Sequence, residues 1–284
     1  MNTFVNLKNG LKIPKLGMGM WSIGDNQQNK NEECMAICKG IESGMTLIDT
    51  AEMYGNGKSE SVVGEAIKNF RRDELFLISK VLPQNAEKNR IKKSLEASLR
   101  RLQTDYLDSY LYHWIGHVPF EEVIEGMENL VKDGLIRSWG VSNFDTLELK
   151  TFIETCGGKN CVLNQVLYHV GSRGIEYDLL PYMEKNNVIP MSYCPLAQGG
   201  RLCSKLLSNE TLMEIAHNHN ISVMQVLLAF VLRYEHMIAI PKSSSVKHTM
   251  ENAAVCTITL SSDEISAIDC EFPAPKHKVP LDLQ

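Results

Sequence analysis

The sequence predicts an α/β fold in which eight parallel strands close into a (β/α)8, or TIM, barrel. Short apolar runs alternate along the chain with stretches that have the amphipathic spacing of helices, which is the pattern of successive βα units. A chain of 284 residues is long enough for such a barrel as one domain. The expected strands are 16–18, 47–50, 75–80, 107–113, 138–141, 162–165, 189–193 and 238–241.

A β-hairpin is expected before the first barrel strand. The segments 5–7 and 11–13 flank Asn9-Gly10, a pair that is typical of a two-residue hairpin turn. Because no composition change and no Pro/Gly/Ser-rich linker divides the rest of the chain, we expect a single domain over residues 1–284.

Four helices have recognisable features. Residues 89–102 carry apolar side chains at three- and four-residue spacing. Residues 120–131 stop before Gly134, which suits a left-handed cap. The stretch 222–234 is apolar on most sides and should be buried, and a last helix begins at 261–264, where serines and acids suit the first turn.

Composition and charge argue against several classes of protein. The formal charge of −5 is spread without a long basic run, which argues against a nucleic-acid partner. No signal peptide is expected, and no run approaches the roughly 18 apolar residues of a membrane span. The eight cysteines include no C-x-x-C pair, so we expect reduced structural cysteines and no metal site. A cytoplasmic monomer is the default expectation.

The most informative segment is 47–54, in which an apolar run ends at Asp49 and Tyr54 follows. Two later strand-like runs end at Lys80 and His113. Barrels keep their active sites at the carboxyl ends of their strands, so these four side chains would converge if the barrel closes. Each residue type alone is more often a cap, a rim aromatic or a solvated group. It is the combination that indicates an acid–base site.

With these residues the chain resembles the aldo-keto reductases. Three motifs occur in that family's order: Asp-Thr-Ala-x-x-Tyr-Gly at 49–55, Gly-Val-Ser-Asn-Phe at 140–144 and Ile-Pro-Lys-Ser at 240–243. Segments 164–169 and 193–198 are most similar to bacterial members that reduce small aldehydes such as methylglyoxal. The resemblance implies that the N-terminal hairpin closes the bottom of the barrel.

The resemblance also implies a reaction, the NAD(P)H-dependent reduction of small aldehydes or ketones to alcohols. The cofactor supplies a hydride, and the protein orients both partners and supplies a proton. Tyr54 would be the general acid, and Lys80 would lower the pKa of its phenol from about 10. Asp49 would keep Lys80 charged and in place. His113 would donate a hydrogen bond to the carbonyl oxygen.

NADPH is the implied cofactor, with NADH as the alternative. The usual G-x-G-x-x-G fingerprint is absent, but a barrel can bind phosphates through the loops after its last strands. The resemblance places Lys242 and the two serines after it at the phosphates, and Tyr193 on the nicotinamide ring. A serine-rich turn that caps a helix is the structural alternative for residues 242–245. The full set implied for the cofactor is Trp21, Ser142, Asn143, Gln165, Tyr193, Pro195, Leu196, Ile240, Lys242, Ser243, Ser244, His248, Glu251 and Asn252.

Position 248 departs from the family pattern. Many NADPH-using relatives carry an arginine there, whereas this chain has His248. Arginine binds phosphate in a bidentate and permanently charged way, and histidine is largely neutral at neutral pH. Because Lys242 remains, with Lys247 nearby, we still expect NADPH, but with a weaker preference over NADH.

The substrate pocket is expected to contain Trp21, Met53, Trp114 and the loop 115–118, with core packing as the alternative role for the two tryptophans. The tail after the last helix is short, which predicts an open pocket. Small aldehydes, dicarbonyls and aryl aldehydes are therefore favoured over steroids.

Two other functions are open from the sequence. One is a non-catalytic nucleotide-binding member of the family, such as a channel auxiliary subunit or a lens structural protein. The other is a barrel isomerase or aldolase that uses Lys80 as a Schiff-base amine. The complete set of four acid–base residues favours the reductase.

Overall fold

The structure is a computed structural model that describes residues 3–197 and 200–283. Its main sheet has eight parallel strands in chain order. Bridges join Leu16 to Ala239 and Gly19 to Lys242, so the first and last strands meet and the barrel closes, which confirms the expected fold. The strands are β3 (Gly17–Gly19), β4 (Leu47–Asp49), β5 (Phe76–Val81), β6 (Ser109–Tyr112), β7 (Trp139–Ser142), β8 (Leu163–Leu167), β9 (Ile189–Tyr193) and β10 (Ile238–Ile240).

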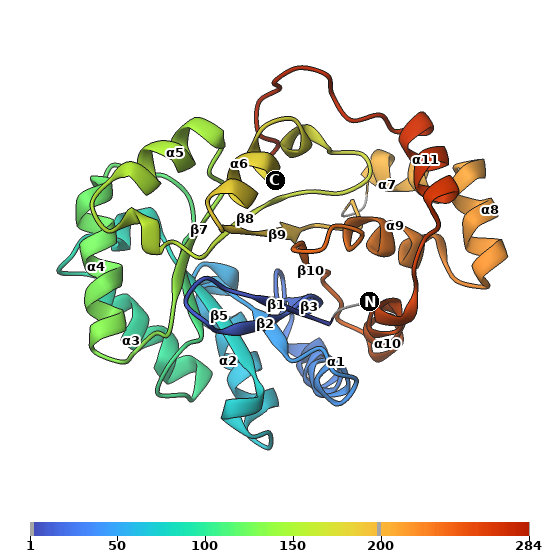
Figure 1. Ribbon diagram of the computed structural model, residues 1–284. Helices are drawn as coiled ribbons and strands as arrows, with labels where there is room; N and C mark the ends of the chain where they lie inside the picture. The colour runs from blue at the N-terminus through green and yellow to red at the C-terminus, as the bar shows by residue number, and fades with distance from the viewer. Residues whose placement is uncertain (1–2, 198–199, 284) are drawn as a thin grey trace.

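Helices surround the barrel, with α2 to α5 on one side and α8 to α11 on the other (Figure 1). The helices are α1 (Lys30–Glu42), α2 (Lys58–Ile67), α3 (Ile91–Leu102), α4 (Phe120–Lys132), α5 (Thr146–Glu154), α6 (Leu179–Lys185), α7 (Gly200–Leu207), α8 (Glu210–His219), α9 (Val223–Val231), α10 (Val246–Ala254) and α11 (Ser262–Glu271). Within residues 3–197 and 200–283, no helix combines the length and apolar character needed to cross a membrane.

The expected helix features are confirmed. Gly134 follows α4 with φ +73°, the left-handed backbone that glycine adopts without strain. Residues 226–231 of α9 are all buried. Ser261 and Glu264 form a capping box at the start of α11.

The N-terminal hairpin is also confirmed, but its turn differs from the expected one. Strands β1 (Phe4–Asn6) and β2 (Lys12–Pro14) pair antiparallel. Leu7 N donates to Leu11 O across a three-residue loop. Within residues 3–197 and 200–283, Gly10 has a positive φ (+88°) and Asn9 does not. A two-residue mirror-image turn needs two positive φ values, so this loop is a tight turn followed by a glycine bulge.

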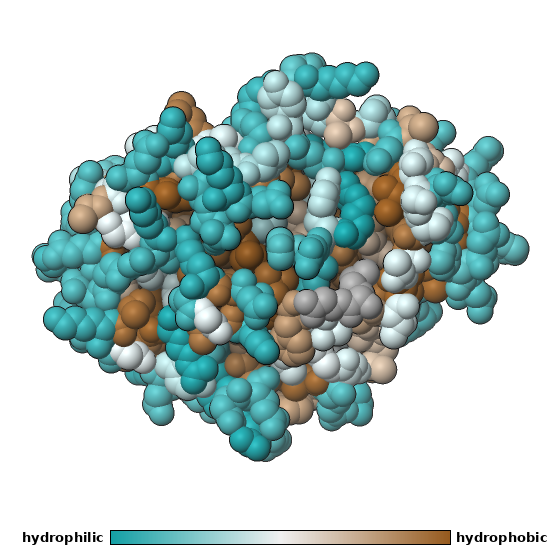
Figure 2. Space-filling view, in the orientation of Figure 1, coloured by the Kyte–Doolittle hydropathy of each residue, from teal (hydrophilic) through white to brown (hydrophobic). Residues whose placement is uncertain are grey.

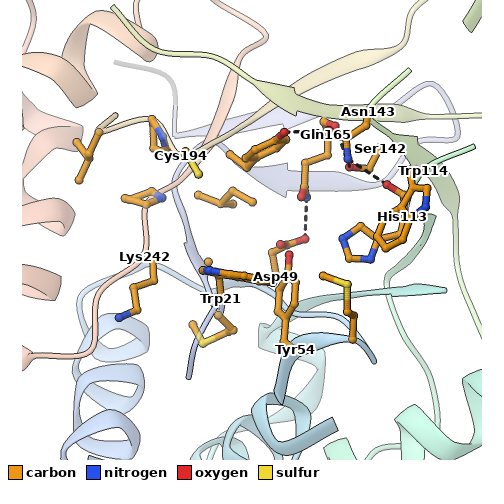
Figure 3. A pocket seen from close by; sticks show the side chains of 18 of the residues that line it. Trp21, Asp49, Tyr54, His113, Trp114, Ser142, Asn143, Gln165, Cys194 and Lys242 are labelled. Atoms are coloured by element: carbon orange, nitrogen blue, oxygen red, sulfur yellow. Dashed lines mark hydrogen bonds between the residues drawn. The ribbon is translucent and has the colours of Figure 1, made fainter. Parts of the chain in front are cut away.

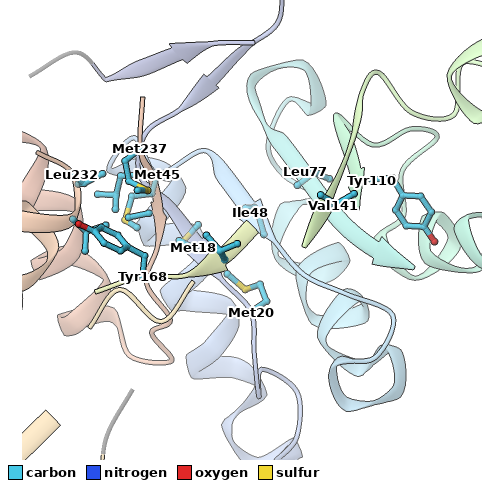
Figure 4. Close-up of a cluster of buried hydrophobic side chains, with 14 of the residues drawn as sticks. Met18, Met20, Met45, Ile48, Leu77, Tyr110, Val141, Tyr168, Leu232 and Met237 are labelled. Atoms are coloured by element: carbon cyan, nitrogen blue, oxygen red, sulfur yellow. The ribbon is translucent and has the colours of Figure 1, made fainter. Parts of the chain in front are cut away.

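The barrel strands alternate between two groups of apolar side chains. Residues such as Ile48, Leu77 and Val141 face outward, where they pack in the large cluster shown in part in Figure 4. Their neighbours Leu47 and Phe76 face inward and fill the barrel. Successive side chains on a strand point to opposite faces, which explains this alternation. Hydrophilic side chains cover the rim formed by the outer helices (Figure 2).

The hairpin lies against one end of the barrel interior. Val5, Leu7 and Ile13 belong to the same buried cluster as Leu47 and Ile238, which lie at or near the starts of their strands. Figure 1 shows the hairpin crossing in front of the barrel strands. The bottom of the barrel is therefore filled with apolar side chains, and polar inward-facing residues are left for the opposite end.

Candidate active site

A cavity of about 550 Å³ lies at the end of the barrel where the strands finish (Figure 3). Every second residue of a strand faces the barrel interior, and this alternation explains why polar side chains lie at the bottom of the cavity. Asp49 pairs with Ile78 across β4 and β5, so Lys80, two residues further, projects from the same face beyond it. His113 follows the inward-facing Leu111 by two residues in the same way. The structure therefore brings the predicted acid–base residues together.

Lys80 connects two of these residues. Its Nζ donates to Asp49 Oδ2 at 2.6 Å, to Thr50 O at 2.9 Å and to Tyr54 OH at 3.2 Å. The side chains of Lys80 and Asp49 are completely or almost completely buried. Burial lowers the pKa of Lys80, but Asp49 and Tyr54 outweigh it, so the net pKa is raised and the amine stays a cation.

Burial is the largest influence on the pKa of both Asp49 and Tyr54. It raises the pKa of Asp49; Lys80 and Gln165 act in the opposite direction, and the net pKa lies above the ordinary value. Burial also raises the pKa of Tyr54; Lys80 lowers it and Asp49 raises it, and the net pKa lies above the ordinary value of 10.0. The expectation that Lys80 would bring the Tyr54 pKa below its ordinary value was therefore wrong, because burial outweighs the lysine. The phenol remains protonated, which is the form a proton donor requires.

His113 is held neutral. Burial, together with the Lys80 charge, lowers its pKa from 6.5 to about 2. Its Nδ1 is buried and has no hydrogen-bond partner among the residues that the structure describes. The ring lies edge-on to Tyr54, with 5.8 Å between centroids, and 4.6 Å from the Trp114 ring. A neutral imidazole with its proton on Nε2 can donate one hydrogen bond into the cavity.

The residues implied for the nicotinamide end are joined to these acid–base residues by hydrogen bonds. Gln165 Nε2 donates to Asp49 Oδ1 at 2.8 Å, and Ser142 Oγ donates to Gln165 O at 3.0 Å. Asn143 Nδ2 donates to the main-chain oxygen of His113 at 3.1 Å, and Tyr193 OH donates to Asn143 Oδ1 at 2.9 Å. Figure 3 shows Gln165, Ser142 and Asn143 beside Asp49 and His113 at the cavity.

The residues implied for the phosphate end lie at the cavity edge and on the first turns of α10. Lys242 lines the cavity, and its Nζ lies 3.3 Å from Ser244 Oγ. Ser245 caps α10 by accepting from His248 N. The structural alternative, a serine-rich turn that caps a helix, is thus present. The helix N-terminus carries partial positive charge, so the cap and an anion site are compatible.

The cavity includes most of the predicted pocket and cofactor residues but not all. Those that line it are Trp21, Met53, Trp114, Ser142, Asn143, Gln165, Tyr193, Pro195, Leu196, Ile240 and Lys242. Those that do not line it are Ser243, Ser244, His248, Glu251 and Asn252, together with the loop 115–118. That loop folds back instead, since Gly116 N donates to Tyr112 OH and Val118 is buried. Gln198, the last residue of one family-like segment, lies outside the described residues.

Sequence reasoning missed Met20, Cys194 and Met224, which also line the cavity. Met224 lies in the first turn of α9, a helix whose apolar composition indicated only burial. The capping box of Ser222 and Gln225 marks that first turn, and a helix start can reach the barrel mouth even when the rest is buried. This signal was present in the sequence.

The C-terminal tail lies on outer loops. Lys278 Nζ contacts Asp145 and, at 2.9 Å, Asp178 Oδ1, while Ser172 Oγ donates to Asp282. In the described chain, no residue after 242 lines the cavity. Trp21 forms part of the cavity wall with 45% of its surface exposed.

The fold and the site together define a closed parallel barrel in which Asp49, Lys80 and Tyr54 are joined by hydrogen bonds at the carboxyl ends of the strands. The model of the aldo/keto reductase family matches residues 15–270, and the chain belongs to that family. Methylglyoxal reductase YeaE of Escherichia coli K12 is 48% identical over 98% of both chains. Glyoxal reductase of Bacillus subtilis is 36% identical over 93% of this chain and 91% of its own.

A solved structure shows the same similarity. An aldo/keto reductase from Klebsiella pneumoniae, crystallised with NADP and acetate, has a TM-score of 0.97 and 45% identity over 100% of both chains. The protein is therefore an oxidoreductase of the aldo/keto reductase family. The aldolase alternative conflicts with the site, because a Schiff-base amine must lose its proton and Asp49 keeps Lys80 charged.

Proposed function

We propose that this protein reduces small aldehydes and α-dicarbonyls such as methylglyoxal to alcohols, with NADPH as the hydride donor. The observation that carries the proposal is the placement of Tyr54 OH, 3.2 Å from the Lys80 ammonium, in an open cavity. Relatives named methylglyoxal reductase and glyoxal reductase support the substrate class.

The residues present fit a nicotinamide cofactor. The Tyr193 ring offers a stacking surface, and the polar side chains of Ser142, Asn143 and Gln165 lie beside it to meet a carboxamide. Lys242 and the N-terminus of α10 offer positive charge for phosphates. When bound, NADPH would supply the hydride.

The protein's own part in the reaction is proton delivery. Tyr54 donates its proton to the carbonyl oxygen while the neutral His113 ring donates a hydrogen bond to the same atom. Lys80 stabilises the phenolate that Tyr54 becomes, and Asp49 keeps the lysine charged and aimed. Gln165 holds the second oxygen of Asp49.

The cavity wall favours small, uncharged carbonyls. Trp21 stands edge-on to Tyr54 with 5.0 Å between ring centroids, and Met53 and Trp114 complete an apolar wall beside the donor. Such a wall recognises short alkyl or aryl groups by contact area. We also propose that the protein acts as a cytoplasmic monomer on small molecules, without nucleic acid or a membrane as partner; the spread of its −5 charge without a long basic run supports the absence of a nucleic-acid partner.

The first experiment follows the loss of NADPH absorbance with methylglyoxal, an aryl aldehyde and a steroid ketone. We expect turnover of the two aldehydes and higher catalytic efficiency with them than with the steroid. More efficient turnover of the steroid would contradict the substrate class. NADPH binding without turnover of any aldehyde would favour the non-catalytic alternative.

A further inference from the structure

We propose that Glu52 is a positioning residue. Its side chain holds the loop that carries Tyr54 against the end of strand β5 and against helix α3. The inference rests on the proposed role of Tyr54 as proton donor. Glu52 lies between Asp49 and Tyr54 in the chain but does not line the cavity. Its side chain points to the opposite side of the loop, toward β5 and α3.

One carboxylate accepts from three donors in two segments, the stretch 82–85 after β5 and helix α3. Glu52 Oε1 accepts from Leu82 N at 2.7 Å and from Asn85 Nδ2 at 3.0 Å. Its Oε2 accepts from Ser94 Oγ in α3. Leu82 follows β5 directly, and Asn85 ends the short 3-10 helix Pro83–Asn85. A carboxylate accepts only, and here each neighbour donates, so the chemistry of the contact is matched.

The contacts of Glu52 affect the distance between Tyr54 OH and Lys80 Nζ, on which the proposed proton delivery depends. The loop from Thr50 to Tyr54 connects β4 to the proposed proton donor, and Lys80 is the second-last residue of β5, two positions before Leu82. Glu52 N also lies 3.4 Å from the Lys80 main-chain oxygen. The side chain and backbone of Glu52 therefore tie the Tyr54 loop to the stretch of chain that carries Lys80. The 3.2 Å contact between Tyr54 and Lys80 depends on that registration.

The test compares kcat, NADPH affinity and the solvent deuterium isotope effect in a graded series. For Glu52→Ala we expect kcat to fall about tenfold to hundredfold, because a misplacement of about 1 Å caused by a substitution away from the reacting atoms can cost about a hundredfold. The solvent isotope effect should rise as proton transfer becomes slower. NADPH affinity should stay within about twofold, since the Glu52 side chain is bonded to Leu82, Asn85 and Ser94 and to none of the residues proposed for the cofactor. Ser94→Ala, which removes one of the three donors, should give a smaller loss.

Two further variants separate positioning from simple stabilisation. Glu52→Gln keeps the shape: its oxygen can accept from Leu82 and Asn85, and its amide can donate to Ser94, so kcat should stay within about threefold of wild type. Glu128 offers a matched control, because its carboxylate accepts from Trp139 Nε1 at 2.8 Å and Asn160 Nδ2 at 2.9 Å, away from the cavity. Glu128→Ala should lower the Tm and leave kcat and the isotope effect unchanged.

A readout that needs no turnover keeps this inference separate from the proposed reaction. In protein labelled at tyrosine 13Cζ, the Tyr54 resonance, assigned with Tyr54→Phe, reports ionisation of the phenol without cofactor. Loosening the Lys80 contact should move that ionisation to higher pH in Glu52→Ala and leave it unmoved in Glu128→Ala. A folded Glu52→Ala protein with wild-type kcat, isotope effect and Tyr54 titration would overturn the proposal. Absence of aldehyde turnover in the wild type would overturn the proposed function, while the titration would still decide the role of Glu52.

Discussion

At the scale of single residues, the site depends on a lysine that burial alone would neutralise. The Asp49 carboxylate at 2.6 Å offsets that effect, so Lys80 keeps its charge beside the phenol of Tyr54. A buried pair of this kind contributes little net stability, but removal of one partner leaves an uncompensated charge. The pair is therefore better explained by the chemistry of Tyr54 than by the stability of the fold.

The cofactor preference is a residue-scale prediction. His248 lies exposed in the first turn of α10, close in sequence to Lys242. His248→Arg should raise the ratio of catalytic efficiencies with NADPH and NADH by about tenfold or more, because a charge-assisted hydrogen bond to a phosphate is worth about 1.5–3 kcal/mol. Efficiency with NADH, which lacks the 2′-phosphate, is the internal control. An equal gain with both cofactors would contradict a phosphate contact at this position.

At the scale of the elements, strand alternation builds the site. Along β7, the inward-facing Gly140 and Ser142 alternate with the outward-facing Trp139 and Val141. Ser142 Oγ and Asn143 N both donate to Gln165 O in β8, at 3.0 and 2.8 Å. The spacing of these two strands thus sets the positions of the residues proposed for the nicotinamide end.

Gly140 allows that spacing. A Cβ at position 140 would lie 2.5 Å from Leu163 O and 2.9 Å from Leu163 Cγ, so Gly140→Ala must push β7 and β8 apart. We expect a loss of about 1–3 kcal/mol in the free energy of unfolding and a weaker NADPH complex. Urea unfolding and quenching of protein fluorescence by NADPH measure the two quantities.

Gly134 provides the control for this prediction. It has a positive φ of +73°, and a Cβ at this position would meet no atom within 4 Å. Gly134→Ala should cost about 1 kcal/mol through backbone strain alone and leave NADPH affinity unchanged. Equal losses of affinity in the two variants would show that Gly140 acts only through stability.

At the scale of the whole molecule, apolar side chains fill one end of the barrel, and the cavity with the proposed active site lies at the other end. The hairpin and inward apolar residues such as Leu47 fill the bottom, and Asp49, Lys80 and Gln165 lie further along the barrel strands, toward the opposite end. The tail is tied to outer loops, for example by Lys278, and leaves the mouth of the cavity uncovered.

Acid sensitivity is a property of the whole molecule. His169 is 5% exposed, and burial lowers its pKa from 6.5 to about 4, against a smaller opposing effect of Asp282. Between these values the unfolded chain binds more protons than the folded one, so stability falls as the pH falls. The contribution of His169 amounts to about 2 kcal/mol between pH 7 and pH 5.

The variant His169→Asn should remove that contribution. Asparagine keeps an acceptor for Gly171 N, which donates to His169 Nδ1 at 3.1 Å. Urea unfolding at the two pH values should show a smaller acid loss in the variant than in the wild type. The same pH dependence in both proteins would mean that His169 titrates normally in the folded state.

The sequence was sufficient for the fold and for the meeting of Asp49, Tyr54, Lys80 and His113 at one end of the barrel, because both depend on alternation and on strand ends; their catalytic roles stay a proposal. Asp49 and Lys80 could be placed without coordinates, since inward-facing polar residues near the carboxyl ends of barrel strands meet at the same end of the barrel. How deeply each side chain is buried could not be predicted from the sequence. The net pKa of Tyr54 and the contacts of Glu52 depend on how neighbouring elements bury each group, which single-strand patterns do not specify.

The most direct test of the account is the turnover of methylglyoxal with NADPH by wild type and by Tyr54→Phe, with NADPH affinity measured in both. Phenylalanine keeps the ring that lies edge-on to Trp21 and removes only the hydroxyl that contacts Lys80. The account predicts that kcat falls by about 10²–10⁴-fold, the range of general acid catalysis, while NADPH affinity is unchanged. A Tyr54→Phe protein as fast as the wild type would contradict it.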